Sequence, residues 1–200
     1  MRDLLASRPE LVPALDGAMR IYDIGTADHS ARVAHMASVT AAELGLSPAE
    51  VEMIGWAGIL HDVGMLAVPA SILRKPGPLT VGEWVEVSRH PAAGADLLLA
   101  VSDRLEPLAA AVRAHHEWWD GSGYPDQLAG EDIPLPARII ALADVYDSVT
   151  HPRPYWTEAY PSEAAMVVMR AESDAHFDPT IAKVFLQMLR AGALEVPSTP

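Results

Sequence analysis

A histidine and an aspartate close one of the most apolar segments of the chain. In WAGILHDVGM, residues 56–65, His61 and Asp62 follow a largely apolar run that begins at Val51 and contains no proline. Such a run is typical of a helix that packs in the core. A carboxylate at its end costs several kcal/mol to bury unless it is paired or bound to a metal. We therefore expect His61 and Asp62 to share a buried site, either an ion pair or a metal centre.

A second histidine lies on the apolar face of another predicted helix. Over residues 28–44, His29 lines up with Val33, Met36 and Thr40 at helical spacing. This spacing predicts that His29 points into the core. His35 falls off that stripe, and we interpret it as a surface or hydrogen-bonded histidine.

Three more histidines and an aspartate lie at helix boundaries or among apolar residues. His90 precedes Pro91, which restricts the backbone and indicates an element boundary. His115 and His116 end the stretch LAAAVRAHH. Adjacent helical side chains diverge by about 100°, so this pair can serve one site only near a helix end or around two metals. In RIIALADVYDSV, Asp144 lies among apolar residues and needs a partner.

Two interpretations of these residues remain open at this point. Ion pairs with Arg32 or Arg138 would satisfy the buried carboxylates. The alternative is a site for divalent metal: the chain has no cysteine, and imidazole with carboxylate suits Fe, Mn or Zn. The candidates outnumber the ligands of one tetrahedral ion, which favours two metals. The candidate metal ligands are His29, His61, Asp62, His90, His115, His116 and Asp144.

The composition limits the classes of protein to which the chain can belong. Its 200 residues suit a single domain, and 50% of them are hydrophobic, which is enough for a sizeable core. A formal charge of -13 opposes nonspecific binding to DNA, RNA or anionic lipid. No apolar run approaches the length of about 18 residues that a membrane span needs. We expect a soluble cytoplasmic protein with no DNA partner and no membrane insertion.

Helical patterns dominate the chain, and alternating strand patterns are nearly absent, which predicts an all-α fold. Ser47, Pro48 and Glu50 supply the N-cap, first-turn proline and capping glutamate of a helix start, and Thr80 with Glu83 repeats the signal. Further helices are expected near residues 11–23, 28–44, 92–100, 105–116, 136–149, 162–172 and 179–190, with a short helical turn at 69–73.

One long segment lacks helical periodicity. Residues 117–136, EWWDGSGYPDQLAGEDIPLP, exceed the usual length of a loop inside a compact domain. Trp118, Trp119 and Tyr124 indicate packing rather than disorder. We therefore expect an ordered, functional loop rich in Gly and Pro.

Nine motifs occur in the order of a known family. They are HSARVA (29–34), ILHDVG (59–64), ILRKPGPLT (72–80, with one intervening Arg), RHPAAGADLL (89–98), HHEWWDGSGYP (115–125), GEDIPLPARI (130–139), ADVYDSVT (143–150), RPY (153–155) and HFDP (176–179). Together they resemble the HD-GYP family of metal-dependent phosphohydrolases, a branch of the HD superfamily. The resemblance implies an all-α, HD-type helical bundle at residues 26–190. An N-terminal helical segment (1–25) would precede it, and a flexible tail (191–200) would follow.

The resemblance also implies a reaction. It is hydrolysis of cyclic di-GMP, a bacterial second messenger, or of a related phosphoester at a centre of two divalent metals, with iron expected and Mn or Zn as alternatives. Asp62 would bridge the metals and is the expected catalytic residue. The metals would activate water and stabilise charge on the phosphoryl oxygens. By motif position, one metal would be held by His29, His61, Asp62 and Asp144, and the other by Asp62, His90, His115 and His116.

The resemblance places three further residues near the substrate. Tyr124 of the GYP signature is similar to a substrate-flanking or partner-facing residue, with packing of the loop as the alternative. Arg153 is similar to a phosphate-binding cation, with a salt bridge as the alternative. Lys75 could reach the cleft, or it could be solvated or fix a loop. Glu117 and Asp120 are expected to brace the loop and the histidines.

Three positions depart from the family pattern. Members normally read HDxGK, with the lysine beside the metals, whereas this chain has Met65. Loss of one such charge donor commonly costs about 10²–10³ in rate. Members with a third metal carry a glutamate four residues before the first histidine, so Gly25 favours two metals. Trp156 stands where a lysine or arginine commonly follows RPY.

These departures leave alternatives to an active cyclic di-GMP phosphodiesterase. The activity could be weak. The chain could instead be a catalytically impaired HD-GYP signalling module that binds a nucleotide, or a signalling-protein partner through the GYP loop. A third hypothesis is an HD phosphohydrolase that acts on another nucleotide.

Overall fold

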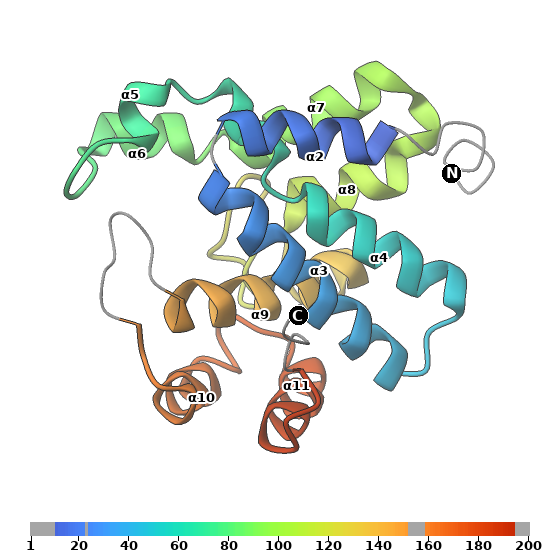
Figure 1. The fold of residues 1–200 in the computed structure, drawn as a ribbon. Helices are drawn as coiled ribbons and strands as arrows, with labels where there is room; N and C mark the ends of the chain where they lie inside the picture. Colours follow the sequence, from blue (N-terminus) through green and yellow to red (C-terminus); the bar gives the residue numbers. More distant parts are fainter. Residues whose placement is uncertain (1–10, 23, 152–158, 195–200) are drawn as a thin grey trace, which may run out of the picture.

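The computed structural model describes residues 11–22, 24–151 and 159–194, without the side chains of residues 22–27. Every regular element in these ranges is helical, which confirms the predicted all-α fold (Figure 1). None of the described helices is long and apolar enough to cross a membrane. The α-helices are α2 (Leu11–Tyr22), α3 (Ile24–Glu43), α4 (Pro48–Leu60), α5 (Ala70–Leu73), α6 (Val81–Val87), α7 (His90–Val101), α8 (Glu106–Ala114), α9 (Leu135–Thr150), α10 (Ser162–Ala171) and α11 (Pro179–Arg190), and the short 3-10 helices are η1 (Val63–Ala67), η2 (Asp103–Leu105) and η3 (Gly130–Asp132).

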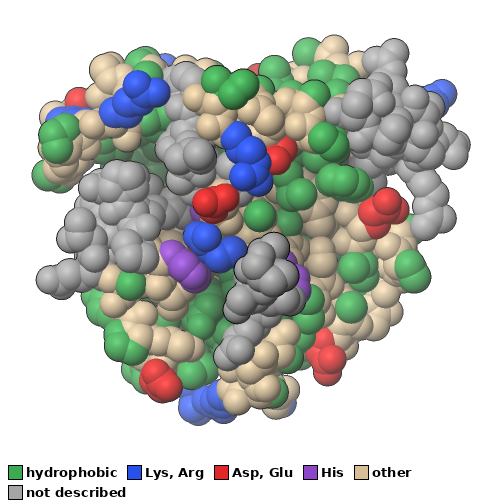
Figure 2. Space-filling view, viewed as in Figure 1, with side chains coloured by type: hydrophobic (Ala, Val, Ile, Leu, Met, Phe, Trp, Pro, Cys, Tyr) green, Lys and Arg blue, Asp and Glu red, His purple; other side chains and the backbone are tan. Residues whose placement is uncertain are grey.

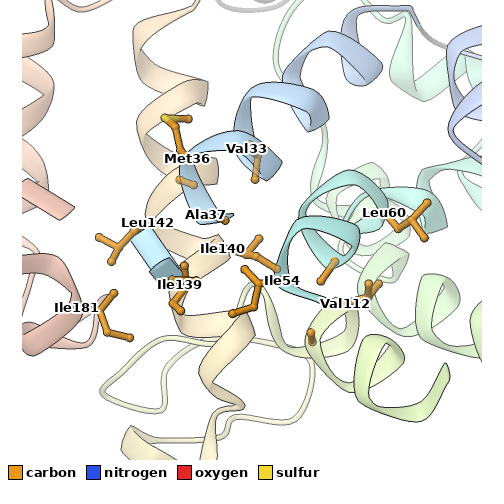
Figure 3. Close-up of a cluster of buried hydrophobic side chains, with 14 of the residues drawn as sticks. Val33, Met36, Ala37, Ile54, Leu60, Val112, Ile139, Ile140, Leu142 and Ile181 are labelled. Atoms are coloured by element: carbon orange, nitrogen blue, oxygen red, sulfur yellow. The ribbon is translucent and has the colours of Figure 1, made fainter. Parts of the chain in front are cut away.

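The core lies between α3, α4, α8 and α9. Figure 3 shows apolar side chains from these four helices converging: Val33 from α3, Ile54 and Leu60 from α4, Val112 from α8 and Ile140 from α9. All five are buried. Burying a large apolar side chain contributes about 1.5–3 kcal/mol, so this cluster fixes the helices relative to one another. These helices, with the residues that directly follow α4 and α8, carry most of the predicted metal ligands.

Two helix starts have the capping boxes that the sequence predicted. The Glu50 N–H donates to the Ser47 hydroxyl at 3.4 Å, and the Ser47 N–H donates to the Glu50 carboxylate at 2.8 Å. Thr80 and Glu83 form the same reciprocal pair at the start of α6. Each pair satisfies backbone N–H groups that a helix start otherwise leaves open.

Two helix boundaries differ from the prediction where the histidines lie. The helix expected at 92–100 begins at His90, so His90 is the first residue of α7. The helix expected at 105–116 ends at Ala114, after which the chain turns. His115 and His116 therefore follow α8, which removes the constraint that adjacent helical side chains diverge.

Gly64 allows η1 to pack against the start of α7. A Cβ atom at this position would overlap the His90 carbonyl oxygen and would lie 2.6 Å from the Gly94 nitrogen. Only glycine therefore permits this approach, in which the turn after Asp62 packs against the backbone of His90.

Both ends of the described chain pack on the core. Val12 and Met19 of α2 are 2% and 3% exposed and join the main apolar cluster, so the N-terminal helix shares a core with the rest. Leu194 is also buried, at 3% exposed. The flexible tail predicted for residues 191–200 stays a prediction, since residues 195–200 lie outside the described ranges.

Candidate metal centre

Six of the seven predicted ligands fall into two compact groups of three. Within each group, one candidate ligand atom per residue lies within 4.8 Å of the others. The first group comes from α3 and the end of α4, and the second from the start of α7 and the end of α8. The first group is His29, His61 and Asp62, and the second is His90, His115 and His116.

Asp144, the seventh predicted ligand, joins the first group from α9. Its Oδ1 lies 3.0 Å from His29 Nε2 and 3.9 Å from His61 Nε2. The Ser148 hydroxyl donates to the same oxygen at 3.3 Å. The fold therefore brings all seven predicted residues to one place, from five helices or helix ends.

Asp62 lies between the two groups. Its Oδ2 is 3.3 Å from His61 Nε2, on the side of the first group. Its Oδ1 is 3.2 Å from His90 Nε2 and 4.0 Å from His115 Nε2, on the side of the second. A carboxylate with one oxygen toward each group has the arrangement that a ligand shared by two cations requires.

Three of the histidines are oriented in the same way by backbone carbonyls. In each, Nδ1 contacts the carbonyl oxygen three residues earlier, in the last turn of a helix where carbonyls lack helical partners. A carbonyl oxygen only accepts, so Nδ1 donates and Nε2 is the nitrogen that faces the centre, where it can bind a cation or a proton. The pairs are His61 with Gly58 at 2.8 Å, His90 with Val87 at 2.7 Å, and His115 with Val112 at 2.6 Å.

Two of the Nε2 atoms are buried without a hydrogen bond. Within the described part of the chain, His29 Nε2 and His61 Nε2 have no hydrogen-bond partner. A buried polar atom left in this state costs about 1–3 kcal/mol. A cation bound between these nitrogens and the carboxylates would satisfy them. The donors present, imidazole nitrogens and ionised carboxylates, fit divalent metal ions.

The two arginines considered as ion-pair partners bind other aspartates. Arg32 Nε and Nη2 donate to Asp147 at 2.6 and 2.9 Å. Arg138 Nη1 donates to Asp178 at 2.8 Å. The ion-pair interpretation named the right arginines but the wrong carboxylates.

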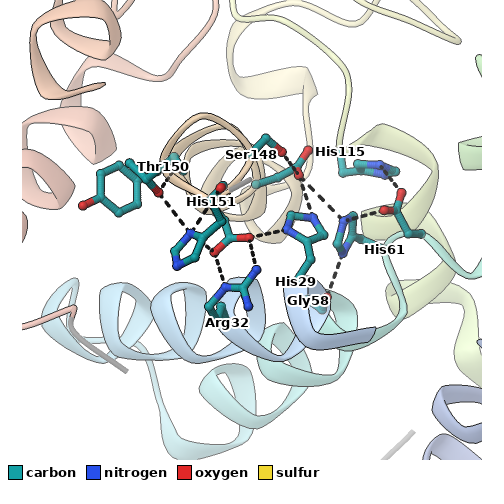
Figure 4. A network of polar contacts seen from close by, with 12 residues as sticks. His29, Arg32, Gly58, His61, His115, Ser148, Thr150 and His151 are labelled. Carbon is teal, nitrogen blue, oxygen red and sulfur yellow. Dashed lines mark hydrogen bonds and ion pairs between the residues drawn. The ribbon is translucent and has the colours of Figure 1, made fainter. Parts of the chain in front are cut away.

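Asp147 is a site residue that the sequence analysis missed. Its side chain is 1% exposed, its Oδ2 accepts from His29 Nδ1 at 2.6 Å, and its Oδ1 lies 3.0 Å from His151 Nδ1 (Figure 4). Together with Arg32, these contacts fix the His29 ring with Nε2 toward Asp144. The available signal was its position three residues after Asp144, on the same side of α9.

The carboxylates of the first group stay ionised. Burial opposes the charge of Asp62, but His61 and His90 hold the pKa of Asp62 well below its ordinary value. Burial likewise opposes the charge of Asp144, and His29 is the main cause of its lowered pKa. Burial also opposes charge on His61, yet Asp62 and Asp144 outweigh it and raise the His61 pKa to about 9. The site thus concentrates negative charge, which attracts a proton or a metal cation.

The two adjacent histidines of the second group are neutral at pH 7. Burial, followed by the neighbouring histidines, holds the pKa of His115 well below its ordinary value. Burial is also the main cause that lowers the pKa of His116 to about 4. Neutral imidazole is the form that binds metals.

The loop after α8 is ordered by its own polar contacts. The Glu117 carboxylate accepts from the Asp126 N–H at 2.6 Å and the Leu128 N–H at 3.1 Å, which confirms that it braces the loop. Asp120 accepts from the Ser122 N–H and hydroxyl at 2.9 and 2.6 Å. This order holds the segment that follows His116 in place.

The three predicted substrate residues differ in what surrounds them. Tyr124 stacks on His116 with ring centroids 4.9 Å apart, so it lies beside the second group. Lys75 Nζ lies 2.6 Å from a carboxylate oxygen of Glu83, the contact expected of a lysine that fixes a loop. Arg153 and Trp156 lie outside the described residues. In the view of Figure 2, histidine, acidic and basic side chains gather in the middle of one face.

Met65 lies in η1, directly after the histidine and aspartate pair. Its side chain is partly buried, and its backbone N–H donates to the Asp62 carbonyl at 2.8 Å. The turn that carries Met65 is therefore tied to a predicted ligand. A neutral thioether occupies the position where members of the HD-GYP family, which this sequence resembles, normally have a lysine.

Two relatives are similar to this chain over most of its length. The cyclic di-GMP phosphodiesterase response regulator RpfG of Xanthomonas campestris pv. campestris is 41% identical over 188 residues, covering 94% of this chain and 50% of the relative. The 3'3'-cGAMP-specific phosphodiesterase 2 of Vibrio cholerae is 40% identical over 191 residues, covering 94% of this chain and 36% of the relative. The chain thus spans half or less of the length of these relatives.

A solved structure and a family model agree with the helical architecture. The HDG"Y"P protein from Bdellovibrio bacteriovorus matches with a TM-score of 0.67 at 16% identity, covering 94% of this chain and 67% of that one, which shows a shared fold. The family model described as HD domain matches residues 1–181. The histidine and aspartate that directly follow α4 are the residues for which such domains are named. With its two groups of donors around them, the chain belongs to the HD domain family.

Proposed function

We propose that the chain is a two-metal phosphodiesterase of the HD-GYP branch that hydrolyses cyclic di-GMP or a related cyclic dinucleotide. The observation that carries the proposal is Asp62, whose two oxygens face two separate groups of buried nitrogen donors. The names of the two relatives, phosphodiesterases for cyclic di-GMP and 3'3'-cGAMP, support the same reaction and substrate class.

In this proposal the side chains that bind the metals are already oriented in the protein, so metal binding requires little rearrangement. Asp62 would be the catalytic residue, because it is the candidate ligand placed to contribute to both metal sites. The backbone carbonyls and Asp147 keep the imidazole rings oriented, so few ring rotations are lost when the site fills. Two divalent metals bound there would activate water and stabilise charge on the phosphoryl oxygens. The proposed ligands are His29, His61, Asp62 and Asp144 for one metal, and Asp62, His90, His115 and His116 for the other.

We propose iron as the metal, with manganese and zinc as alternatives. HD domains are metal-dependent, and the donors in this chain are imidazole and carboxylate without thiolate. Such ligands suit all three metals, so the assignment to iron rests on the resemblance. Elemental analysis distinguishes the three.

The contacts of the substrate residues support unequal roles. Tyr124, stacked on His116, is placed beside the proposed phosphate site, in keeping with a substrate-flanking residue. The ion pair of Lys75 with Glu83 favours the loop-fixing alternative over direct substrate contact. Arg153 stays a proposed phosphate contact. A cytoplasmic location, the lack of a DNA partner and a signalling-protein partner at the GYP loop also stay proposals.

Met65 favours a second candidate function. If the lysine that it replaces is needed to neutralise charge on the reacting phosphate, the chain would bind the dinucleotide without hydrolysing it and act as a signalling module. The retained set of seven ligands favours hydrolysis. Substitution of this one residue separates the two candidates.

The proposed function is tested by metal analysis and turnover of the anaerobically purified protein. We expect about two metals per chain, which is the requirement of a two-metal mechanism. We expect hydrolysis of cyclic di-GMP or 3'3'-cGAMP that is lost in His61→Ala. Met65→Lys should raise the rate, by up to about 10²–10³ if the lysine acts as a preorganised charge donor.

Three outcomes decide between the hypotheses. Less than one metal per chain would overturn the proposed function. A metal-loaded wild type that binds cyclic di-GMP without cleaving it, and gains turnover in Met65→Lys, would establish the signalling module. Turnover of another nucleotide in a substrate panel, with no activity on cyclic dinucleotides, would establish the third hypothesis.

A further inference from the structure

Three rings lead from the second group of ligands to the surface. Tyr124 stacks on His116 with centroids 4.9 Å apart and an interplanar angle of 27°. Trp84 of α6 meets Tyr124 edge to face, with centroids 5.2 Å apart and an angle of 70°. Trp84 is 48% exposed. The row of rings therefore begins at His116, a candidate metal ligand, and ends at Trp84, whose side chain is partly exposed to solvent.

Packing does not account for Trp84. None of the residues of α6 is buried, so the helix contributes little to the apolar core. Leu79 and Val81, which lie close to Trp84 in the chain, are also exposed. Apolar surface gathered in this way beside a candidate site is typical of a ligand-binding surface.

Trp84 is nevertheless held in position. The capping box of Thr80 and Glu83 fixes the start of α6, and Lys75 ties Glu83 to the segment after α5. The Tyr124 ring contacts the Trp84 ring and restricts its rotation. A side chain placed beforehand in this way loses little conformational freedom when a ligand binds.

We propose that Trp84, with Tyr124, forms the surface on which one purine base of the cyclic dinucleotide stacks. This inference rests on the proposed function. In a cyclic dinucleotide each phosphodiester joins two riboses, and each ribose carries a base. A substrate whose phosphate lies at the ligands beside His116 therefore carries a base nearby, on the side where Tyr124 and Trp84 lie.

The charge of the protein makes such a contact valuable. The chain has 27 acidic against 14 basic residues, which disfavours an anionic ligand at a distance. Position 65, where the resembling family has a lysine, is a methionine. Stacking of a base on an aromatic ring supplies affinity that does not depend on protein cations.

The test compares Trp84→Ala and Trp84→Phe with the wild type in the metal-loaded protein. Steady-state kinetics would be measured with cyclic di-GMP and with methyl p-nitrophenyl phosphate, a phosphodiester without a purine base. Val85→Ala is the matched control, because Val85 is the exposed neighbour on the same helix. Metal content is measured for every variant.

We expect Trp84→Ala to raise the KM for cyclic di-GMP about tenfold, within the range measured for loss of one base stack. The kcat, the metal content and the rate with methyl p-nitrophenyl phosphate should stay near wild type. Trp84→Phe should recover most of the affinity, since its ring still offers a stacking face. Val85→Ala should resemble the wild type.

The outcomes separate this inference from the function on which it rests. If the wild type cleaves cyclic di-GMP and Trp84→Ala leaves its KM unchanged, the stacking surface is refuted and the proposed function stands. If Trp84→Ala lowers the rates with both substrates or reduces metal content, Trp84 has a structural role and the inference is also refuted. If the wild type does not cleave cyclic di-GMP, and cyclic di-GMP does not inhibit hydrolysis of methyl p-nitrophenyl phosphate, the proposed function fails and the inference fails with it.

Discussion

Replacing Asp147 by asparagine should weaken one metal site and spare the other. Asp147 contacts His29 Nδ1 on one side and Arg32 and His151 on the other, so its contacts with the candidate ligands are on the side of the first group. Asparagine keeps the shape of the side chain and one oxygen that can accept from Nδ1. It loses the negative charge that strengthens the lone pair of His29 Nε2 and that balances Arg32.

The size of the effect follows from the contacts that lose their charge. A hydrogen bond to a charged group contributes about 1.5–3 kcal/mol, and a neutral one about 0.5–1.5 kcal/mol. Replacing the charged contact to His29 by a neutral one therefore removes about 1–2 kcal/mol, or a factor of about 5–30 in affinity. Loss of a partner that orients a metal-binding histidine commonly costs about 10–100-fold in metal affinity or activity. We expect about tenfold weaker binding of one metal.

The assay is stepwise metal release to a competing chelator, with a thermal melt for each variant. Asp178→Asn is the matched control, since Asp178 is also buried and paired with an arginine, Arg138. Asparagine can still cap α11, where the Asp178 carboxylate now accepts two backbone N–H groups. Both variants should lose some stability, and only Asp147→Asn should lose metal affinity. If Asp147→Asn weakened the binding of both metals equally, or weakened the binding of neither, the role assigned to Asp147 would be refuted.

Three further predictions concern the surrounding structure. Gly64→Ala forces η1 away from the backbone of His90, so it should destabilise the fold by at least about 1–3 kcal/mol and reduce metal binding, as followed by urea unfolding and elemental analysis. Lys75, then the N-cap contacts of Thr80, hold the pKa of Glu83 at about 2; because this pKa is lowered, the stabilisation is present above the ordinary pKa of glutamate and is lost as the pH falls through about 2. Lys75→Met should therefore move the Glu83 pKa upward in an NMR titration, and an unchanged value would contradict the ion pair. Chelation of the metals should lower the melting temperature without unfolding the protein at pH 7, since a proton on His61 can then balance Asp62; unfolding on chelation would show that the metals are needed for the fold.

The sequence singled out the candidate ligands because each one lies in a local pattern that requires a partner. His61 and Asp62 end an apolar helix, and Asp144 lies among apolar residues of another. The sequence could not show which aspartate of α9 contacts Arg32, because that contact depends on how α9 is rotated against α3. Asp144 and Asp147 are three residues apart on the same face, and only the packed structure separates their partners. The contact of Trp84 with Tyr124 was equally hidden, since it joins a helix to a loop remote in the chain.

The position of each histidine in its helix explains why one of them needs Asp147. His61, His90 and His115 each come shortly after the end of a helix: α4, α6 and α8, respectively. The carbonyl three positions earlier lies in the last turn of that helix and is available to accept from Nδ1. The same local geometry thus orients three rings. His29 lies inside α3, where the carbonyls of the preceding turn are engaged in helical hydrogen bonds. Its ring is oriented instead by a group from another helix, the Asp147 carboxylate of α9.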